Sequence, residues 1–154
     1  MPKRKLGMSV LDAAQERIVW TFDSFEKIYV SFSGGKDSTV MLHLVMDEVI
    51  KRKRKVGVMF VDLEGQYKLT IDHIQKCYDM YKDYIEPYWC CLPIHLRNAV
   101  SVYETHWVCW EKSKEDSWIR QPPENSIIDE KYFPFFRHGM EFEEFVPEFG
   151  EWYS

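Results

Sequence analysis

The sequence has no long apolar run. Within its 154 residues, no uninterrupted hydrophobic stretch approaches the roughly 20 residues that a membrane-spanning helix requires. The N-terminus, "MPKRKLGMSV", has a charged start, but it has neither the apolar segment nor the small-residue cleavage site of a secretory signal. We therefore expect a cytoplasmic protein with no membrane partner.

Cysteine is also scarce. The four thiols are Cys77, Cys90, Cys91 and Cys109. They are too few for a disulfide scaffold, and the adjacent pair has an awkward geometry for bonding to itself. We expect all four to be reduced. Hydrophobic residues make up 45% of the chain, which argues against disorder and suits one domain over residues 1–154.

Charge is distributed unevenly along the chain. Residues 1–60 carry 11 Lys and Arg against 7 Asp and Glu, a balance of +4, whereas residues 61–154 carry 9 against 18, a balance of −9. The excess of positive charge favours an anionic ligand near the N-terminal half.

The periodicity of the first ninety residues alternates between helix and strand. The expected order is a helix capped by Ser9, a strand at 27–32, a loop at 33–38, a helix to about residue 53, a buried strand at 56–62, a helix at 67–84 and a third strand at 85–92. Strands that alternate with helices imply right-handed crossovers and a parallel sheet. The expected fold is a three-layer α/β domain with its core in residues 9–92.

The remaining residues, 93–154, have weaker signals. Prolines interrupt an aromatic-rich stretch, in which short helices are possible at 94–104 and 138–146. We expect this portion to pack on the sheet as irregular structure.

The most specific motif is "SGGKDS" at 33–38, between a strand and a helix. The N-terminus of a helix presents unpaired N–H groups and about half a positive charge, which together bind oxyanions. Gly34 and Gly35 allow a tight turn and a close approach of the ligand, Lys36 adds a cation, and Ser33 and Ser38 add hydroxyls. These residues predict a phosphate site.

Two familiar nucleotide motifs do not fit this loop. A Walker A sequence needs a glycine where the chain has Val30 and a Ser or Thr where it has Asp37. The dinucleotide pattern G-x-G-x-x-G is also absent, because the two glycines are adjacent and no third follows.

The motif instead resembles the loop of the N-type ATP pyrophosphatases, or adenine nucleotide alpha hydrolases, which hold the pyrophosphate of ATP while the α-phosphorus is attacked. The resemblance implies an adenine nucleotide ligand, ATP with Mg²⁺, and catalytic roles for Lys36 and Asp37. The residues that it places on the nucleotide in and before this loop are Ser31, Ser33, Gly34, Gly35, Lys36, Asp37 and Ser38.

The wider pattern is similar to the phosphoadenosine phosphosulfate (PAPS) reductase branch. "IYVSFSGGKDS" is followed by "VGVMFVDLEGQY", and in that branch the end of this second strand holds adenine; here it is Phe60, Val61 and Asp62. The runs "WCCLPIHLRNAVSVYE" and "WVCWE" resemble an uncharacterised, often phage- or plasmid-borne subfamily that is frequently accompanied by a ParB-like partner protein.

The sequence also departs from that branch. Sulfonucleotide reductases carry a Glu-Cys-Gly-Leu-His segment near the C-terminus, and this chain has none. Reduction of a sulfonucleotide is therefore disfavoured. Members of the subfamily are also longer, so the chain is expected to be a short version of the family.

Metal binding has two candidate sets. Asp37 and Asp62, as carboxylates beside the predicted phosphates, could hold Mg²⁺. A zinc site is possible but disfavoured at Cys90, Cys91, His95 and Cys109, because no paired C-x-x-C accompanies them.

Three functions stay open. The leading one is cleavage of ATP between its α- and β-phosphates to adenylate an acceptor. The second is a non-catalytic nucleotide-binding regulatory subunit that acts with a ParB-like partner, and assembly as a homo-oligomer also stays open. The third is nucleic-acid binding through the basic turn "KRKRK" at 51–55.

Overall fold

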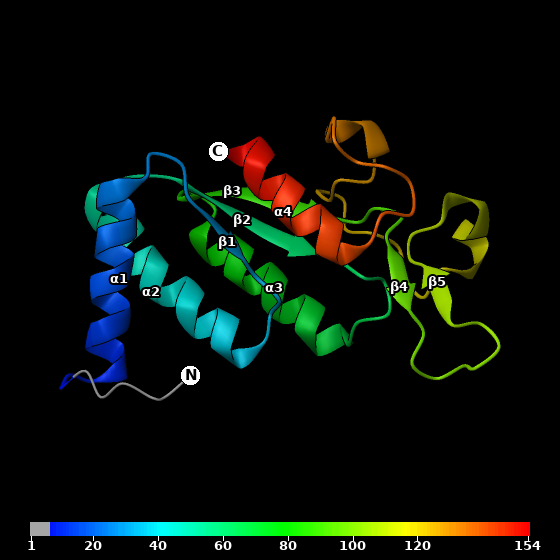
Figure 1. Cartoon of the computed structure of the whole chain (residues 1–154), viewed down its shortest axis with the longest axis horizontal. Coiled ribbons are helices and arrows are strands. Elements are labelled where there is room, and N and C mark those ends of the chain that lie inside the picture. The colour runs from blue at the N-terminus through cyan, green and yellow to red at the C-terminus, as the bar shows by residue number, and fades with distance from the viewer. Residues whose placement is uncertain (1–6) are drawn as a thin grey trace.

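The computed structural model describes residues 7–154, and it has a three-stranded parallel sheet between helices (Figure 1). The elements run α1 (Val10–Ser24), β1 (Tyr29–Ser31), α2 (Lys36–Arg52), β2 (Val56–Val61), α3 (Lys68–Tyr81), β3 (Ile85–Cys90), β4 (His95–Arg97), β5 (His106–Val108), the 3₁₀ turns η1 (Lys112–Ser117) and η2 (Glu130–Tyr132), and α4 (Phe142–Tyr153). The predicted α/β order up to residue 90 is confirmed.

The helix α1 begins where the sequence predicts. The Ser9 hydroxyl accepts a hydrogen bond from the Asp12 backbone N–H at 3.1 Å, which satisfies one of the donors left free at a helix start. The other end of α1 is tied to the turn after α2, where the Arg54 guanidinium donates to the backbone oxygens of Phe22, Phe25 and Glu26.

The sheet has the order β1-β2-β3, with every pair parallel. Pro87 lies in β3 without breaking the ladder. The neighbouring Trp89 uses its backbone oxygen on the outer side of the strand, where it accepts from Ile127. Pro87 faces the same way by the alternation of the strand, so its missing N–H removes no bond to β2.

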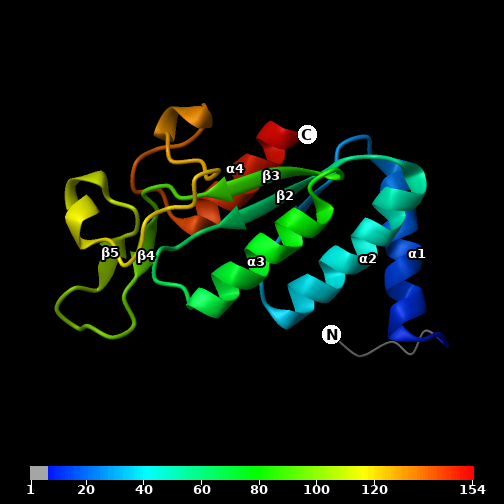
Figure 2. The ribbon, with the colours of Figure 1, turned by 180° about the vertical axis from the view of Figure 1, so that it is seen from behind.

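The sheet is covered on both faces. The helices α2 and α3 lie on one side and α4 on the other, as the two opposite views show (Figures 1 and 2). On the first side, Tyr78 of α3 packs edge-on against Trp89 of β3. On the second side, Tyr153 of α4 lies over Gly57, where an added Cβ would be 2.9 Å from the tyrosine ring, and it donates to Glu86 at 3.2 Å. The predicted three-layer arrangement is confirmed.

The helix expected at 94–104 is wrong. Residues 95–97 instead form β4, which pairs antiparallel with β5 and brings His95 opposite Val108. The backbone N–H groups at its start already have partners, since Ile94 N–H donates to the backbone oxygen of Leu92 and His95 N–H donates to that of Met140. These bonds fix an extended chain after Pro93, and the distant partner could not be seen in the local sequence.

The last helix begins later and extends farther than the expected 138–146. Glu141 caps α4 and forms a capping box with Glu144, so the helix starts at Phe142 and continues to Tyr153. Pro147 lies inside it. Phe145 and Phe149 on either side of this proline are fully buried, and their packing outweighs the lost backbone bond. Among the helices of residues 7–154, none combines the length and apolar character needed to cross a bilayer.

Candidate functional site

The glycine loop (residues 33–38) connects the carboxyl end of β1 to the start of α2. Gly35 is the N-cap of α2 and has no side chain to cap it, and the first helical bond inside the loop runs from Thr39 N–H to Gly35 O at 2.9 Å. The N–H groups of the preceding residues therefore have no partner within the helix. Such unpaired donors at a helix start are what the predicted anion site requires.

Gly34 brings the loop against α3. Its φ is +73°, in the left-handed region, and a Cβ added there would lie 2.8 Å from both Cδ1 and Cγ1 of Ile74 and 3.0 Å from Cγ2 of Thr70. Only a residue without a side chain fits both the backbone conformation and this contact. Close packing on α3 is thus the structural reason for the first glycine.

The two charged side chains of the loop extend into solvent. Lys36 is 90% exposed and Asp37 is 89% exposed, and they pair with each other at 3.0 Å. An ion pair at this exposure contributes little to stability. Both side chains are therefore free to exchange this contact for a ligand.

The hydroxyl groups of the loop converge on one carbonyl. Ser38 Oγ donates to Gly35 O at 3.0 Å and Thr39 Oγ1 donates to the same oxygen at 2.8 Å, while Ser33 Oγ lies 3.0 Å from Ser38 Oγ. Ser31, at the end of β1, has an exposed side chain on the face of the sheet opposite Val30. The hydroxyls thus shape the loop as well as being available to a phosphate.

The end of β2 opens beside this loop. Phe32 N–H donates to Met59 O at 2.8 Å, and within residues 7–154 it is the last backbone bond between the two segments before the chain turns into the glycine loop. Phe60 and Val61 have buried side chains, and the backbone of Phe60 faces β3, so only the backbone groups of Val61 could meet a ligand at this edge. This is the kind of contact that the resemblance implies for adenine.

Asp62 has a different environment from the one expected of a magnesium ligand. Its side chain is 0% exposed and pairs with Arg120. It also accepts from Trp89 Nε1 at 2.8 Å and from Glu64 N–H at 3.0 Å. Both of its oxygens accept from protein donors, so the buried carboxylate does not fit a metal site in this arrangement and serves to hold the chain together.

Glu64 is a second buried acid that the sequence did not single out as structural. It accepts from Trp110 N–H at 2.8 Å and from Ile119 N–H at 3.1 Å. Both Glu64 and Trp110 adopt left-handed backbone conformations, with φ of 62° and 52°. The spacing Asp62-x-Glu64 directly after a buried strand is the one signal that could have pointed to this pair.

The zinc set is not brought together. In the part of the chain that the structure describes, no three His, Cys, Asp or Glu side chains are arranged to hold a metal ion. Cys109 Sγ instead donates to the backbone oxygens of Leu92 and Ile94. His95 stacks on His106, with ring centroids 4.6 Å apart.

All four cysteines are buried, and we expect them to react slowly with a thiol reagent in the native protein. Burial raises the pKa of each thiol, that of Cys109 to about 12, and so suppresses the reactive thiolate. A colorimetric thiol assay should detect little fast reaction before denaturant is added and four thiols afterwards. A native cysteine that reacts as fast as free cysteine would contradict this, and mass spectrometry would identify it.

The basic turn lies at the far end of α2 from the glycine loop (Figure 2). A helix of 17 residues separates the two, about 25 Å at the usual rise per residue. Three of its five cations have protein partners: Lys51 pairs with Glu48, Arg52 pairs with Asp23 and Glu48, and Arg54 caps α1. The turn is therefore mainly a connection between α1 and α2, and nothing at this turn favours a nucleic-acid site.

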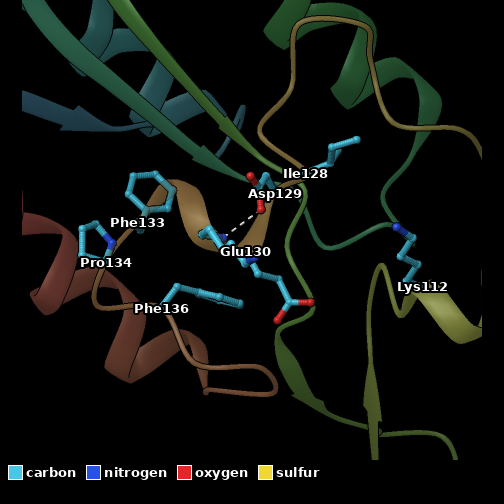
Figure 3. Close-up of a pocket in the computed structure, with 8 residues that line it drawn as sticks. Lys112, Ile128, Asp129, Glu130, Phe133, Pro134 and Phe136 are labelled. Carbon is cyan, nitrogen blue, oxygen red and sulfur yellow. Dashed lines mark hydrogen bonds between the residues drawn. The ribbon is translucent and has the colours of Figure 1, made fainter.

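A depression of about 740 Å³ lies in the C-terminal portion, away from the glycine loop (Figure 3). Phe133, Pro134 and Phe136 form one wall, while two lysines and two acids contribute to the rest: Lys112, Lys131, Asp129 and Glu130. The balanced charge of this lining does not match a phosphate site. We place the functional centre at the glycine loop, where unpaired donors and an exposed cation coincide.

Two comparisons with known proteins bear on the family of the chain. The family model described as the phosphoadenosine phosphosulfate reductase domain matches residues 27–115. The uncharacterized protein YbdN of Escherichia coli (strain K12) is 44% identical over 153 residues, which is 99% of this chain but 37% of that protein. The chain thus spans little more than a third of the length of this relative.

The matched region covers more than half of the chain, and it contains β1, the glycine loop, α2, β2, α3 and β3. The predicted resemblance and the predicted fold are both confirmed. The chain belongs to the phosphoadenosine phosphosulfate reductase domain family and has the adenine nucleotide alpha hydrolase-like fold.

Proposed function

We propose that this protein binds ATP with the pyrophosphate portion on the glycine loop and cleaves it between the α- and β-phosphates. The observation that carries the proposal is the uncapped start of α2, with Lys36 90% exposed beside it. Unpaired N–H groups, the helix dipole and a mobile cation all attract a polyanion. Family membership supports a nucleotide as that polyanion.

The adenine would lie where β1 and β2 separate. By the alternation of the strand, the backbone groups of Val61 face the side that β1 has left, as those of Met59 do, and the Val61 side chain is buried. Carboxyl ends of parallel strands are the usual ligand edge of open α/β sheets. ATP placed in this way would extend from the end of β2 to the start of α2.

Magnesium fits one of the two predicted carboxylates. Asp37 is on the loop and is 89% exposed, whereas Asp62 is fully buried and engaged by Arg120. Mg²⁺ is usually held by one or two carboxylates together with substrate phosphates. Asp37 would hold it, and the ion would neutralise charge that develops on the phosphates.

The chemistry is a displacement at the α-phosphorus. A nucleophilic oxygen of an acceptor would form a bond to this phosphorus, while the bond to the oxygen bridging the α- and β-phosphates breaks and its electron pair leaves with pyrophosphate. Lys36 and the N–H groups of the loop would stabilise that leaving charge. The products are an adenylated acceptor, or AMP when water is the acceptor, and pyrophosphate.

Replacing Lys36 by alanine is expected to lower the affinity for ATP by roughly ten- to a hundredfold, the range of a hydrogen bond to a charged group. Calorimetry gives the affinity, and assays of pyrophosphate and AMP after incubation with Mg-ATP give the reaction. Lys51→Ala is the matched control, because Lys51 is also an exposed, paired lysine of α2 but lies at its opposite end.

The outcomes separate the proposed functions. Release of pyrophosphate that depends on Lys36 supports the enzyme. Measurable ATP affinity without release above the Lys36→Ala background would instead support a nucleotide-binding subunit, which could then be assayed with a ParB-like partner. Absence of ATP affinity in the unaltered protein would overturn both.

A further inference from the structure

His73, on α3, contacts the glycine loop from outside it. Its Nε2 lies 2.9 Å from Thr39 Oγ1, in the first turn of α2. The ring also packs near Phe32, with centroids 6.2 Å apart. Two other residues of α3, Thr70 and Ile74, pack against Gly34. The two helices therefore meet at the loop.

The direction of the hydrogen bond follows from the proton that Thr39 has available. Thr39 Oγ1 donates its only proton to Gly35 O at 2.8 Å. It can then only accept from the histidine. His73 must carry its proton on Nε2, so that donation runs from His73 to Thr39 and from Thr39 to Gly35 O. Cys77 Sγ, at 3.7 Å from the same nitrogen, is a weaker competing acceptor.

Because the peptide bond is planar, the hydrogen bonds from His73 through Thr39 to Gly35 O also orient the Lys36 N–H. Gly35 C=O and Lys36 N–H belong to one trans peptide unit, and in such a unit the two groups point in opposite directions. Holding the carbonyl oxygen toward Thr39 therefore aims the Lys36 N–H away from α2, into the space where the anion would bind. The same carbonyl also accepts from Thr39 N–H at 2.9 Å, and the histidine adds to that constraint.

We propose that His73 is a positioning residue, which orients the Gly35–Lys36 peptide through Thr39 so that Lys36 N–H points at the pyrophosphate portion of the nucleotide. This inference rests on the proposed function for the ligand, although the hydrogen-bond chain itself does not. His73 contacts no predicted ligand atom and acts only through Thr39.

The test compares three histidine variants. His73→Leu removes the donor, and His73→Gln keeps an N–H at a similar reach. His43→Leu is the matched control, because His43 also bridges α2 to α3, through Tyr81, but away from the glycine loop. Calorimetry with ATP, inorganic pyrophosphate and AMP measures the effect, and thermal unfolding shows whether each variant folds.

His73→Leu should weaken ATP and pyrophosphate about three- to tenfold, the usual range for one hydrogen bond, and leave AMP unchanged, since AMP lacks the β- and γ-phosphates. His73→Gln should recover most of the loss, and His43→Leu should show none. A Thr39→Val background should abolish the effect of His73→Leu, because both substitutions interrupt the same chain.

Equal losses for AMP and pyrophosphate, or equal losses in His43→Leu, would overturn the positioning role and show general damage. Nitrogen NMR of the ligand-free protein, at a pH where the ring is neutral, should find the His73 proton on Nε2; a proton on Nδ1 would also overturn it. If unaltered protein bound neither ATP nor pyrophosphate, the proposed function would fail. The NMR result would still show whether His73 donates to Thr39.

Discussion

Replacing Gly34 by alanine is expected to abolish measurable ATP binding and to lower the free energy of unfolding by about 2–5 kcal/mol. About 1–2 kcal/mol comes from a left-handed backbone at a residue with a Cβ, and about 1–3 kcal/mol from overpacking a filled core. The new Cβ would lie 2.8 Å from Ile74, whose side chain is fully buried and cannot move aside. Calorimetry and chemical denaturation measure the two effects.

Gly139→Ala is the control for this substitution. Gly139 has φ of +72°, almost the value at Gly34, but a Cβ there would meet no atom within 4 Å. The free energy of unfolding should therefore fall only by the roughly 1–2 kcal/mol that the left-handed backbone costs, and the affinity for ATP should not change. If both variants lost the same stability and both bound ATP, the contact between the glycine loop and α3 would not determine the shape of the site.

Replacing Arg120 by methionine is expected to destabilise the protein by about 3–5 kcal/mol, because a buried carboxylate loses its counter-charge. Asp62 is 0% exposed, and its other partners are uncharged donors. Methionine keeps an apolar stem over Trp110, against which the guanidinium lies 5.0 Å from the ring centroid. The melting temperature, measured by calorimetry, should fall by roughly 6–20 °C at this chain length.

The companion variant is Arg137→Met. Arg137 also binds a carboxylate, that of Glu148, but the pair is 57% and 33% exposed, and its loss should cost less than about 1 kcal/mol. The double variant Asp62→Asn with Arg120→Met should recover part of the stability, because it removes both charges. Similar losses from Arg120→Met and Arg137→Met would mean that Asp62 is solvated and free to bind a metal.

The sequence predicted what depends on neighbouring residues. The Ser9 cap, the glycines and the strand-loop-helix order around Lys36 are local, and the parallel sheet and the loop between β1 and α2 follow from them as predicted. The buried run of β2 was recognisable because a strand covered on both faces must be apolar throughout, and each of its residues is indeed buried.

The errors arose where a distant partner decides the structure. The local sequence predicts a helix where β4 lies, because the partner strand β5 comes only after an eight-residue loop that carries no turn signal. The local sequence also places Asp62 at the ligand, because its ion-pair partner, Arg120, lies 58 residues farther along the chain. His73 could not be interpreted at all, since its hydrogen bond joins two helices that only the fold brings together.

The acids after β2 also bear on how the chain folds. Glu64 and Trp110 are 46 residues apart, and Asp62 and Arg120 are 58 apart. Each doubling of such a loop adds only about 0.6 kcal/mol of closure entropy, so equilibrium stability is little affected, but contacts of long sequence separation form slowly. During synthesis, β1, β2 and β3 can pair as soon as residue 90 emerges, whereas Asp62 remains without its counter-charge until residue 120 has followed. The sheet that holds the glycine loop therefore forms before the segment that neutralises the buried carboxylate directly after β2.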